Sequence, residues 1–221
     1  MEPYCTDFAS DEIFTELRLH PPKPVLSSTV KILLLPLLAL VSSCSLPAED
    51  ATDPPTYDDE ASLPEGWPKP GPYNEVSEKE YPAYRAAFTD GKGSMTSFWR
   101  LFGHIKKNDI PMTAPVEMAM KVEEEGKMKM ASMGFLYQNT GVGEIGKDGE
   151  KIEIRDIPKE KVLSYTWMGG RNDKSLKIAK AALEAALAEK NLTLKSFRLL
   201  GYNGPGTPTK KRTHELQALL K

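Results

Sequence analysis

The sequence has only two cysteines among its 221 residues, Cys5 and Cys44, and both precede the region with regular hydrophobic patterns. A fold held together by disulfide bonds is therefore excluded, and the later region has no free thiol to misoxidise outside the cytoplasm. The sequence also has no glycine-rich phosphate loop, no Cys/His set at metal-ligand spacing and no serine nucleophile motif. These absences argue against nucleotide-dependent, metal-dependent and serine-dependent catalysis.

Long apolar runs are equally scarce, and the longest covers the ten residues 32–41. As a helix this run would extend about 15 Å, half of the roughly 30 Å that a membrane span needs. Lys31 precedes the run, and Val-Ser-Ser-Cys, ending at Cys44, closes it. This arrangement resembles a bacterial lipoprotein signal, which implies cleavage before Cys44 and a lipid on its thiol. A buried strand or helix with an incidental cysteine is the alternative.

Residues 1–29 fit poorly in front of such a signal, because they carry five acids where a cationic leader is expected. We hypothesise that translation starts at Val30 and that residues 1–29 are an artefact of start-site assignment. Residues 30–43 would then be the signal peptide. The expected localisation is the bacterial cell envelope, with the protein lipid-anchored and facing the periplasm. Ser45, after the lipidated cysteine, favours the outer membrane.

Residues 44–72 are expected to form the lipidated cysteine and an acidic, proline-rich tether. From residue 45 to residue 72 the chain has seven prolines, seven acids and one base. Such a segment buries too little apolar area to offset the entropy lost on ordering, so we predict that it is disordered. Residues 73–221 carry 25 Lys and Arg against 19 Asp and Glu, a net charge of +6. They are predicted to form the folded domain.

The first half of this domain has a strand–helix–strand–strand pattern. Residues 81–88 are typical of a strand, and a helix that Ser94 caps follows it and ends at Asn108. Even positions from 112 to 122 are apolar, which predicts a second strand, and residues 127–137 predict a third.

The same pattern repeats in the second half. Strands are predicted at residues 151–155 and 161–168, and then a helix that Asn172 or Asp173 caps and that ends at Asn191. The last two strands are predicted at residues 192–200 and 213–220. This repetition favours an α+β fold of two pseudo-symmetric halves, with two helices packed on an antiparallel sheet or barrel.

The segment NDIPMTAPV, residues 108–116, resembles the most characteristic segment of the SOUL heme-binding protein family. Three further elements follow in family order: residues 151–170, the second helix, and GYNGPGTPTKKRTHEL at residues 201–216. The resemblance covers residues 75–220. It implies a twisted antiparallel β-barrel of eight or nine strands with two helices, and a shallow apolar cleft between the first helix and the loop before the last strand. It also implies that the protein binds heme or another tetrapyrrole non-covalently and does not catalyse a reaction of this ligand.

Several positions depart from the family pattern. Met95 and Gly103 stand where other members carry cations that face the heme propionates, and the early strand lacks the histidine that ligates heme in one member. His214 stands where an asparagine is usual. The resemblance therefore implies a ligand held without an assured axial protein ligand. His104 lies roughly 130° from the centre of the apolar stripe of its helix, at 100° per residue, and is predicted to face solvent.

The residues predicted to bind the tetrapyrrole form two groups. The helix contributes Met95, Phe98, Trp99 and Phe102, and the loop and last strand contribute Lys210, Lys211, Arg212 and His214. Aromatic side chains suit the flat faces of a tetrapyrrole, and cations suit its carboxylates. Core packing and a solvated basic turn are the alternatives. No catalytic residue and no metal site of the protein's own is predicted.

The apolar residues after the Met-Thr-Ala-Pro segment are predicted to be barrel interior rather than ligand contacts. These are Met112, Val116, Met118 and Met120, and Glu117 is expected on the other side of the strand.

The predicted function is that of an envelope-anchored, non-catalytic carrier or buffer of heme or related tetrapyrroles. A binding module for another amphipathic ligand or for a protein partner is the alternative, and an enzyme is the third reading. The expected partners are the tetrapyrrole and, through Cys44, the membrane. No nucleic-acid partner is predicted, and a monomer is expected.

Replacing Cys44 with Ala should leave the protein uncleaved or released from the envelope, because the lipid supplies the anchor. Membrane fractionation and the size of the processed chain measure both effects. Normal processing together with normal membrane association of Cys44→Ala would show that the lipoprotein reading is wrong.

Overall fold

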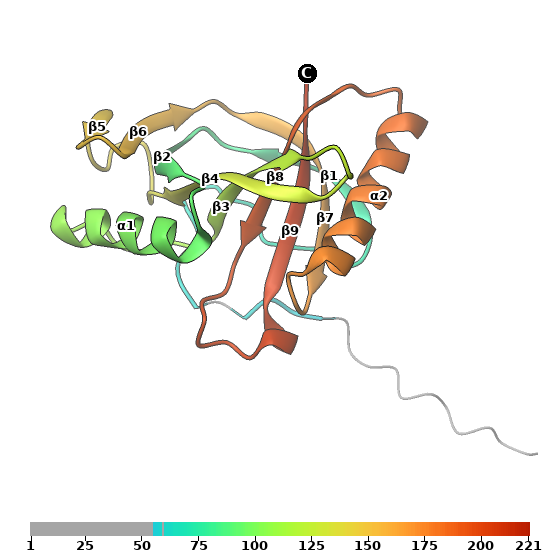
Figure 1. Ribbon diagram of the computed structural model, residues 1–221, viewed down its shortest axis with the longest axis horizontal. Coiled ribbons are helices and arrows are strands. Elements are labelled where there is room, and N and C mark those ends of the chain that lie inside the picture. Colours follow the sequence, from blue (N-terminus) through green and yellow to red (C-terminus); the bar gives the residue numbers. More distant parts are fainter. Residues whose placement is uncertain (1–54, 59) are drawn as a thin grey trace, which may run out of the picture. The chain divides into compact units, whose positions relative to one another are not determined.

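The computed structural model describes residues 55–58 and 60–221 (Figure 1). The expected extension, the signal peptide and Cys44 lie outside the described residues. Within the described ranges, no helix is long and apolar enough to cross a membrane.

The described chain forms nine strands, two α-helices and one short 3-10 helix. In chain order they are β1 (Val76–Tyr81), β2 (Tyr84–Asp90), α1 (Ser94–Lys107), β3 (Val116–Val122), β4 (Met128–Leu136), β5 (Gly146–Asp148), β6 (Ile152–Ile157), β7 (Glu160–Met168), α2 (Asp173–Glu189), β8 (Leu194–Gly201), η1 (Thr209–Lys211) and β9 (Thr213–Leu220).

The predicted elements are present, with three local differences. The strand predicted at residues 81–88 is β2, which begins only at Tyr84, and β1, which ends at Tyr81 before Pro82, was not predicted. The glycine-rich turn after β4 contains the short strand β5. Ser94 is the first residue of α1 rather than its cap, because Gly93 occupies the N-cap position with φ of 90°. At α2, Asn172 is the N-cap as expected, and it exchanges hydrogen bonds with Ser175.

All nine strands belong to one sheet, in the order β1-β7-β9-β8-β3-β4-β2-β6-β5, and every neighbouring pair is antiparallel. The α+β class and the strand number agree with the prediction. The sheet does not close, because β1 and β5 are its two edges and no ladder joins them in the described residues. The predicted barrel is therefore an open, curled sheet.

The strand order shows the two pseudo-symmetric halves. From the centre outward, β8, β9, β7 and β1 on one side correspond to β3, β4, β2 and β6 on the other. β1 precedes β2 in the chain but pairs with β7, and β6 precedes β7 but pairs with β2. The first strand of each half therefore pairs with a strand of the other half, so the two halves cannot separate without breaking strand pairs.

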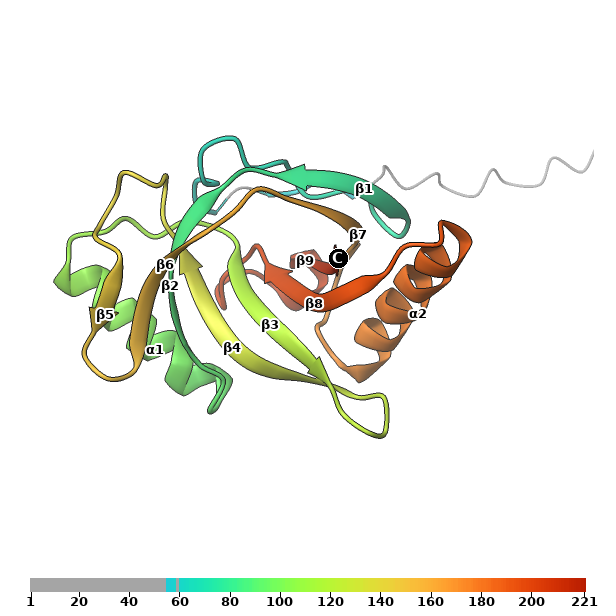
Figure 2. The same ribbon diagram turned by 90° about the horizontal axis from the view of Figure 1, so that it is seen from above.

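This exchange forces the sheet to curl. β1 and β2 lie six places apart in the strand order, yet only residues 82–83 connect them. Three Cα–Cα steps cover at most about 11 Å, so both strands must bend toward each other. The residues 158–159 that join β6 to β7 impose the same constraint from the other half. Figure 2 shows the strands curving around a common interior.

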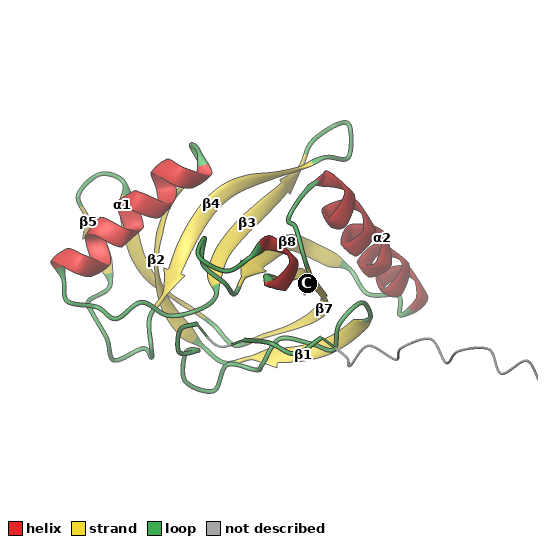
Figure 3. Ribbon diagram, turned by 90° about the horizontal axis from the view of Figure 1, so that it is seen from below, coloured by secondary structure: helices red, strands yellow, loops and turns green. Residues whose placement is uncertain are grey.

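The helices cover the outer face of the curled sheet, α1 over β2 and β4 and α2 over β7 and β9. Viewed from below, they lie at opposite ends of the sheet (Figure 3). Buried residues of both helices, among them Leu101 and Leu183, belong to one apolar cluster with the outward-facing residues of the strands, such as Phe135 and Leu216. Leu101, Leu183 and Leu216 are fully buried in it.

The inner face carries buried charges, which the sequence did not indicate. Glu117 of β3 is 7% exposed and accepts a 2.5 Å hydrogen bond from the Tyr84 hydroxyl, although it was expected to lie outside the core. Arg198 of β8 reaches the same hydroxyl at 2.8 Å. β8 and β2 are three places apart in the sheet, which a flat sheet would separate by about 14 Å. The curl brings these side chains together.

A second part of this inner network surrounds Glu215 of β9, which is fully buried. Its carboxylate accepts hydrogen bonds from Tyr81 at 2.5 Å, from Lys79 at 2.8 Å and from Gln217 at 2.7 Å. Gln217 in turn accepts a 2.6 Å bond from Arg198, so the two parts are joined. Burial and the adjacent carboxylate raise the pKa of Tyr81, which therefore stays a neutral donor.

Residues 60–72, which we call the strap, close the open side of this interior. The ring of Trp67 packs edge-on against Tyr81 at 4.7 Å and Tyr84 at 5.1 Å between ring centroids. Backbone bonds hold the strap to Ala114, Gln138 and, through Gly71, the Thr166 hydroxyl. The disorder predicted as far as residue 72 is therefore wrong for the strap, because the curled sheet offers an apolar and aromatic face that Trp67 covers.

Replacing Arg198 with Ala should lower the free energy of unfolding by about 3–5 kcal/mol, because it leaves the buried carboxylate of Glu117 without its cation. Urea unfolding measures the change. Arg155→Ala is the matched control, since Arg155 pairs with Glu153 at the surface and should cost less than about 1 kcal/mol. Equal losses in the two variants would contradict a stabilising role of the buried network.

Candidate functional site

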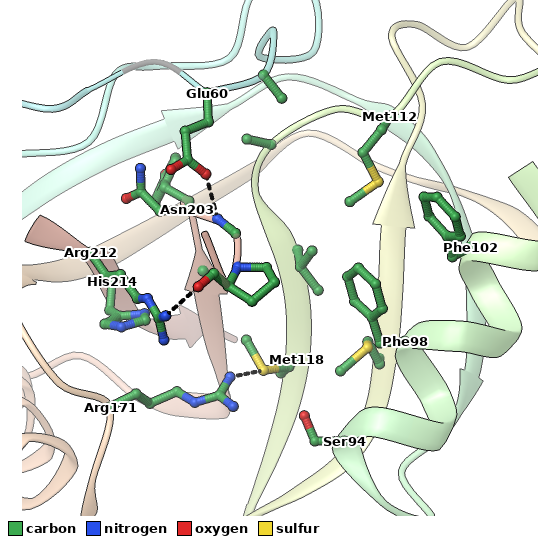
Figure 4. Close-up of a pocket in the computed structure, with 18 of the residues that line it drawn as sticks. Glu60, Ser94, Phe98, Phe102, Met112, Met118, Arg171, Asn203, Arg212 and His214 are labelled. Carbon is green, nitrogen blue, oxygen red and sulfur yellow. Dashed lines mark hydrogen bonds between the residues drawn. The ribbon is translucent and has the colours of Figure 1, made fainter. Parts of the chain in front are cut away.

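A cleft of about 530 Å³ opens between α1, β3 and the β8–β9 loop, residues 202–212 (Figure 4). This is the position that the sequence resemblance implied. Its size falls within the usual range of small-molecule sites. The lining residues come from segments far apart in the sequence: Glu60, Ala61, Ser94, Met95, Phe98, Trp99, Phe102, Met112, Thr113, Ala114, Val116, Met118, Met133, Arg171, Gly201, Tyr202, Asn203, Gly204, Pro205, Arg212 and His214.

The wall that α1 provides is aromatic. Phe98 and Phe102 lie one helical turn apart with nearly parallel rings, their centroids 6.1 Å apart, and Trp99 stands at a right angle to both. Phe98 also packs edge-on against Phe135 of β4, which fixes its position. Trp99 and Met95 form the outer lip and are 58% and 68% exposed. The wall therefore offers flat apolar surface to a ligand.

The opposite wall is cationic. Arg171 comes from the β7–α2 turn, residues 169–172, while Arg212 and His214 flank the start of β9. Figure 4 shows these three side chains on one side of the cleft and Phe98 and Phe102 on the other, with Met118 between them. Neither arginine has a carboxylate within 4.0 Å in the described part of the chain. This wall thus carries positive charge that no protein acid neutralises.

Six of the eight predicted binding residues lie in the wall of this one cleft: Met95, Phe98, Trp99, Phe102, Arg212 and His214. Lys210 and Lys211 do not; they are exposed on η1. Arg171 and Glu60 are cleft residues that the sequence did not indicate, because only the folded chain brings the β7–α2 turn and the strap to this place. That these residues bind a ligand remains a prediction.

The strand that follows Met-Thr-Ala-Pro serves both the core and the cleft. Met118 and Met120 are 3% and 9% exposed and are therefore core, but this core lies on the outer face of the sheet, under the helices, so the prediction that they fill the barrel interior is wrong. Met112, Val116 and Met118 also line the cleft. The Ala114–Pro115 peptide bond is cis, directly before β3 begins. The strand forms the floor between the two walls (Figure 4).

His104 is buried and lies outside the cleft, so the prediction that it faces solvent is wrong. It is 5% exposed; its Nδ1 lies 2.6 Å from the Asp148 carboxylate and its Nε2 lies 2.7 Å from the Tyr137 hydroxyl. Asp148 belongs to β5, the strand missed from the sequence, and this strand covers the helix face that was expected to be free. The bonds to His104 and Lys107 lower the pKa of Asp148 to about 2.

His214 has an unusual environment in the cleft wall. It is 6% exposed, and its Nδ1 has no hydrogen-bond partner among the residues that the structure describes. Burial, and then the charges of Arg171 and Arg212, lower the pKa of His214 to about 4, while a backbone contact at Gly169 opposes the shift. The imidazole is therefore neutral near pH 7, and its free nitrogen is covered by neighbouring atoms rather than open to the cleft.

The family assignment follows from the sequence as a whole. Residues 71–218 match the profile of the SOUL heme-binding protein family. Because this match covers about two thirds of the chain, the protein belongs to the SOUL heme-binding protein family. No curated protein matches the sequence significantly.

Solved structures share the fold at low sequence identity. The EcmrR chain of an EcmrR–DNA complex matches with a TM-score of 0.51 and 17% identity, over 66% of this chain and 57% of that one. An uncharacterized conserved protein from Listeria innocua matches with a TM-score of 0.51 and 12% identity, over 68% and 94% of the two chains. A hydrolase from Listeria innocua matches with a TM-score of 0.50 and 11% identity, over 68% and 94%. At these identities the likeness concerns the fold alone.

Replacing His214 with Gln should make the protein less sensitive to mild acid. Between pH 6.5 and 4 the unfolded chain binds a proton at His214 that the folded chain refuses, so the free energy of unfolding falls as the pH falls through this window. The wild type should lose about 2 kcal/mol from this source between pH 7.5 and pH 5. Urea unfolding of both proteins at the two pH values measures the difference, and an equal loss in both would contradict it.

Proposed function

We propose that the protein binds heme or a related tetrapyrrole in this cleft and does not transform it. The observation that carries the proposal is the pairing of an aromatic wall with a cationic wall across one 530 Å³ cleft, in a member of the SOUL heme-binding protein family. A tetrapyrrole has the matching chemistry, since its faces are apolar and its carboxylates are anionic.

The residues of the cleft suit such a ligand in distinct ways. Phe98, Trp99 and Phe102 would contact the ring faces, and Arg171 and Arg212 would face the carboxylates. Heme would bring an iron that can take an axial ligand. The Nδ1 of His214 is covered by neighbouring atoms, and we expect the burial of the ring faces to supply most of the affinity.

A non-catalytic role fits the composition of the cleft. Its wall holds one carboxylate, Glu60, which accepts a 2.6 Å bond from the Gly204 backbone, and one neutral buried imidazole. No group of three or more His, Cys, Asp or Glu side chains that could hold a metal ion exists in the described ranges. We therefore propose a carrier or buffer, held at the cell envelope by a lipid on Cys44, for which the Cys44→Ala fractionation is the test.

A binding module for a different amphipathic ligand or for a protein is the second candidate. The observation that favours it is the exposure of Met95 and Trp99 at the lip of the cleft, 68% and 58%, which a partner's apolar surface could cover. A wild-type protein that takes up neither heme nor protoporphyrin would favour this candidate.

The experiment is a paired titration of the purified full chain with heme and with iron-free protoporphyrin, followed by the Soret band and by quenching of Trp99 emission. We expect reversible binding of both, with affinities within about tenfold, which is a difference below roughly 1.4 kcal/mol. A strong preference for heme that disappears in His214→Ala would contradict binding without an axial ligand and would identify His214 as that ligand.

The position of the site is tested by Phe102→Asp. A charge on the aromatic wall should weaken binding of both tetrapyrroles by at least about tenfold, because burying it against the ring costs free energy. Ile178→Asp is the matched control, since Ile178 is 51% exposed on α2, away from the cleft. Thermal melts of both variants separate loss of binding from loss of fold. Equal affinities of Phe102→Asp and the wild type would place the ligand elsewhere.

A further inference from the structure

The two walls of the cleft differ in chemistry, and this difference constrains how a ligand can lie in it. The aromatic wall is formed by Phe98, Trp99 and Phe102, and no described cation lines the cleft on this side; Lys106, whose Nζ lies 5.4 Å from the centre of the Phe102 ring, is outside the cleft wall. The cationic wall is formed by the β7–α2 turn and the β8–β9 loop and carries Arg171 and Arg212. A ligand with carboxylates around its whole ring would place some of them against the aromatic wall.

Arg171 lacks a strong partner in the described part of the chain. Within the described residues its one hydrogen bond goes from Nη1 to the thioether sulfur of Met118, at 2.6 Å, and thioethers are weak acceptors. Burial of the guanidinium, and then the charge of Arg212, lower the pKa of Arg171. Because the residue as a whole still reaches solvent, the cost of keeping its charge is modest. Its remaining N–H groups are free to hold an anion.

Arg212 supplies a second cation beside the first. Its Nε donates to the Thr207 carbonyl and its Nη2 to the Pro205 carbonyl, both at 2.8 Å, so the β8–β9 loop holds the guanidinium in place. The repulsion between the two arginines would be relieved by an anion between them. Glu60, the carboxylate of the cleft wall, forms no ion pair with either. A guanidinium binds a carboxylate through paired N–H groups, which gives direction as well as affinity.

We propose that Arg171 and Arg212 hold the carboxylates of the bound tetrapyrrole, and that the cleft therefore selects tetrapyrroles whose acids share one edge of the ring. This inference rests on the proposed function, which it deepens by naming the ligand class and its orientation. The carboxylate edge lies at the β7–α2 turn, and the part of the ring without acids has its faces in contact with the aromatic wall of α1. Tetrapyrroles with acids around the whole ring are rejected, because their other carboxylates would lose water against Phe98 and Phe102 without a partner.

The test compares ligands that differ only in their acids. Protoporphyrin IX carries its propionates on one edge, its dimethyl ester has the same ring without charge, and uroporphyrin carries acids all round. We expect the full-length wild type to bind the diacid roughly tenfold to a hundredfold more tightly than the ester, the range of one or more charge-assisted hydrogen bonds. Uroporphyrin should bind more weakly than protoporphyrin despite its greater charge.

Arg171→Gln should remove most of the preference for the diacid and leave the affinity for the ester within about twofold. Lys211→Gln is the matched control, because it removes the same charge from the same side of the cleft but lies outside its wall. It should leave both affinities within about twofold, apart from a salt-dependent change shared by all anions. Arg171→Lys keeps the charge without the paired N–H groups and should recover part of the preference.

The outcomes separate this inference from the proposed function. If the wild type binds ester and diacid equally, or if uroporphyrin binds as tightly as protoporphyrin, the inference is wrong while tetrapyrrole binding stands. Equal effects of Arg171→Gln and Lys211→Gln on the diacid would also overturn it, since only general electrostatic attraction would remain. If the wild type binds neither ester nor diacid, the proposed function falls and the inference with it. The ligand comparison in the wild type needs no variant, so it decides the question even if a variant fails to fold.

Discussion

The two short connections between exchanged strands are the constraint on which the rest of the structure depends. Residues 82–83 and 158–159 each join strands that lie six places apart in the sheet. A flat sheet cannot satisfy such links, so the sheet curls until its two ends approach each other. Once curled, it has an enclosed inner face and an outer face on which both helices pack. The barrel-like form thus arises from chain connectivity, although no ladder closes it in the described residues.

The enclosed inner face explains why charged side chains can be buried at all. Glu117, Glu160 and Glu215 are each hydrogen-bonded to a cation or a tyrosine hydroxyl, and Arg198 joins three strands. Glu117, Glu160 and Tyr84 raise the pKa of Arg198 against the lowering effect of its burial, so its charge is retained. Paired in this way, the charges hold the curl in one register, whereas any one of them left alone would destabilise the fold.

Part of the outer face stays open, because α1 and α2 do not cover it completely. The uncovered strip runs between α1 and the β8–β9 loop, with β3 as its floor, and this strip is the cleft. Its two walls come from segments that differ in composition, an aromatic helix and two arginine-bearing turns. The strap completes one end through Glu60, which holds the Gly204 backbone. A site assembled in this way can recognise a ligand by shape and by one charged edge without any reactive group.

Local sequence patterns determined the helices, most of the strands and their succession along the chain, because hydrophobic periodicity depends only on which face of each element is buried. Residues 213–220 agree with β9 at both ends, and Asn172 caps α2 as predicted. The aromatic wall of α1 was also predictable, since Phe98, Trp99 and Phe102 lie close together on one helix.

What periodicity could not supply is which polar side chains meet across the fold. Glu117 and His104 were expected to lie outside the core because the strand and helix periods place them away from the apolar faces, yet the curl encloses one and the unpredicted strand β5 covers the other. Arg171 had no local signal, and only the tertiary structure brings it beside Met118 and Arg212, more than 40 residues away from each along the chain. The sequence by itself determined the elements and the aromatic wall, and the tertiary structure decided which charged groups join the site, adding Arg171 and Glu60 and leaving out Lys210 and Lys211, because this depends on distances in space.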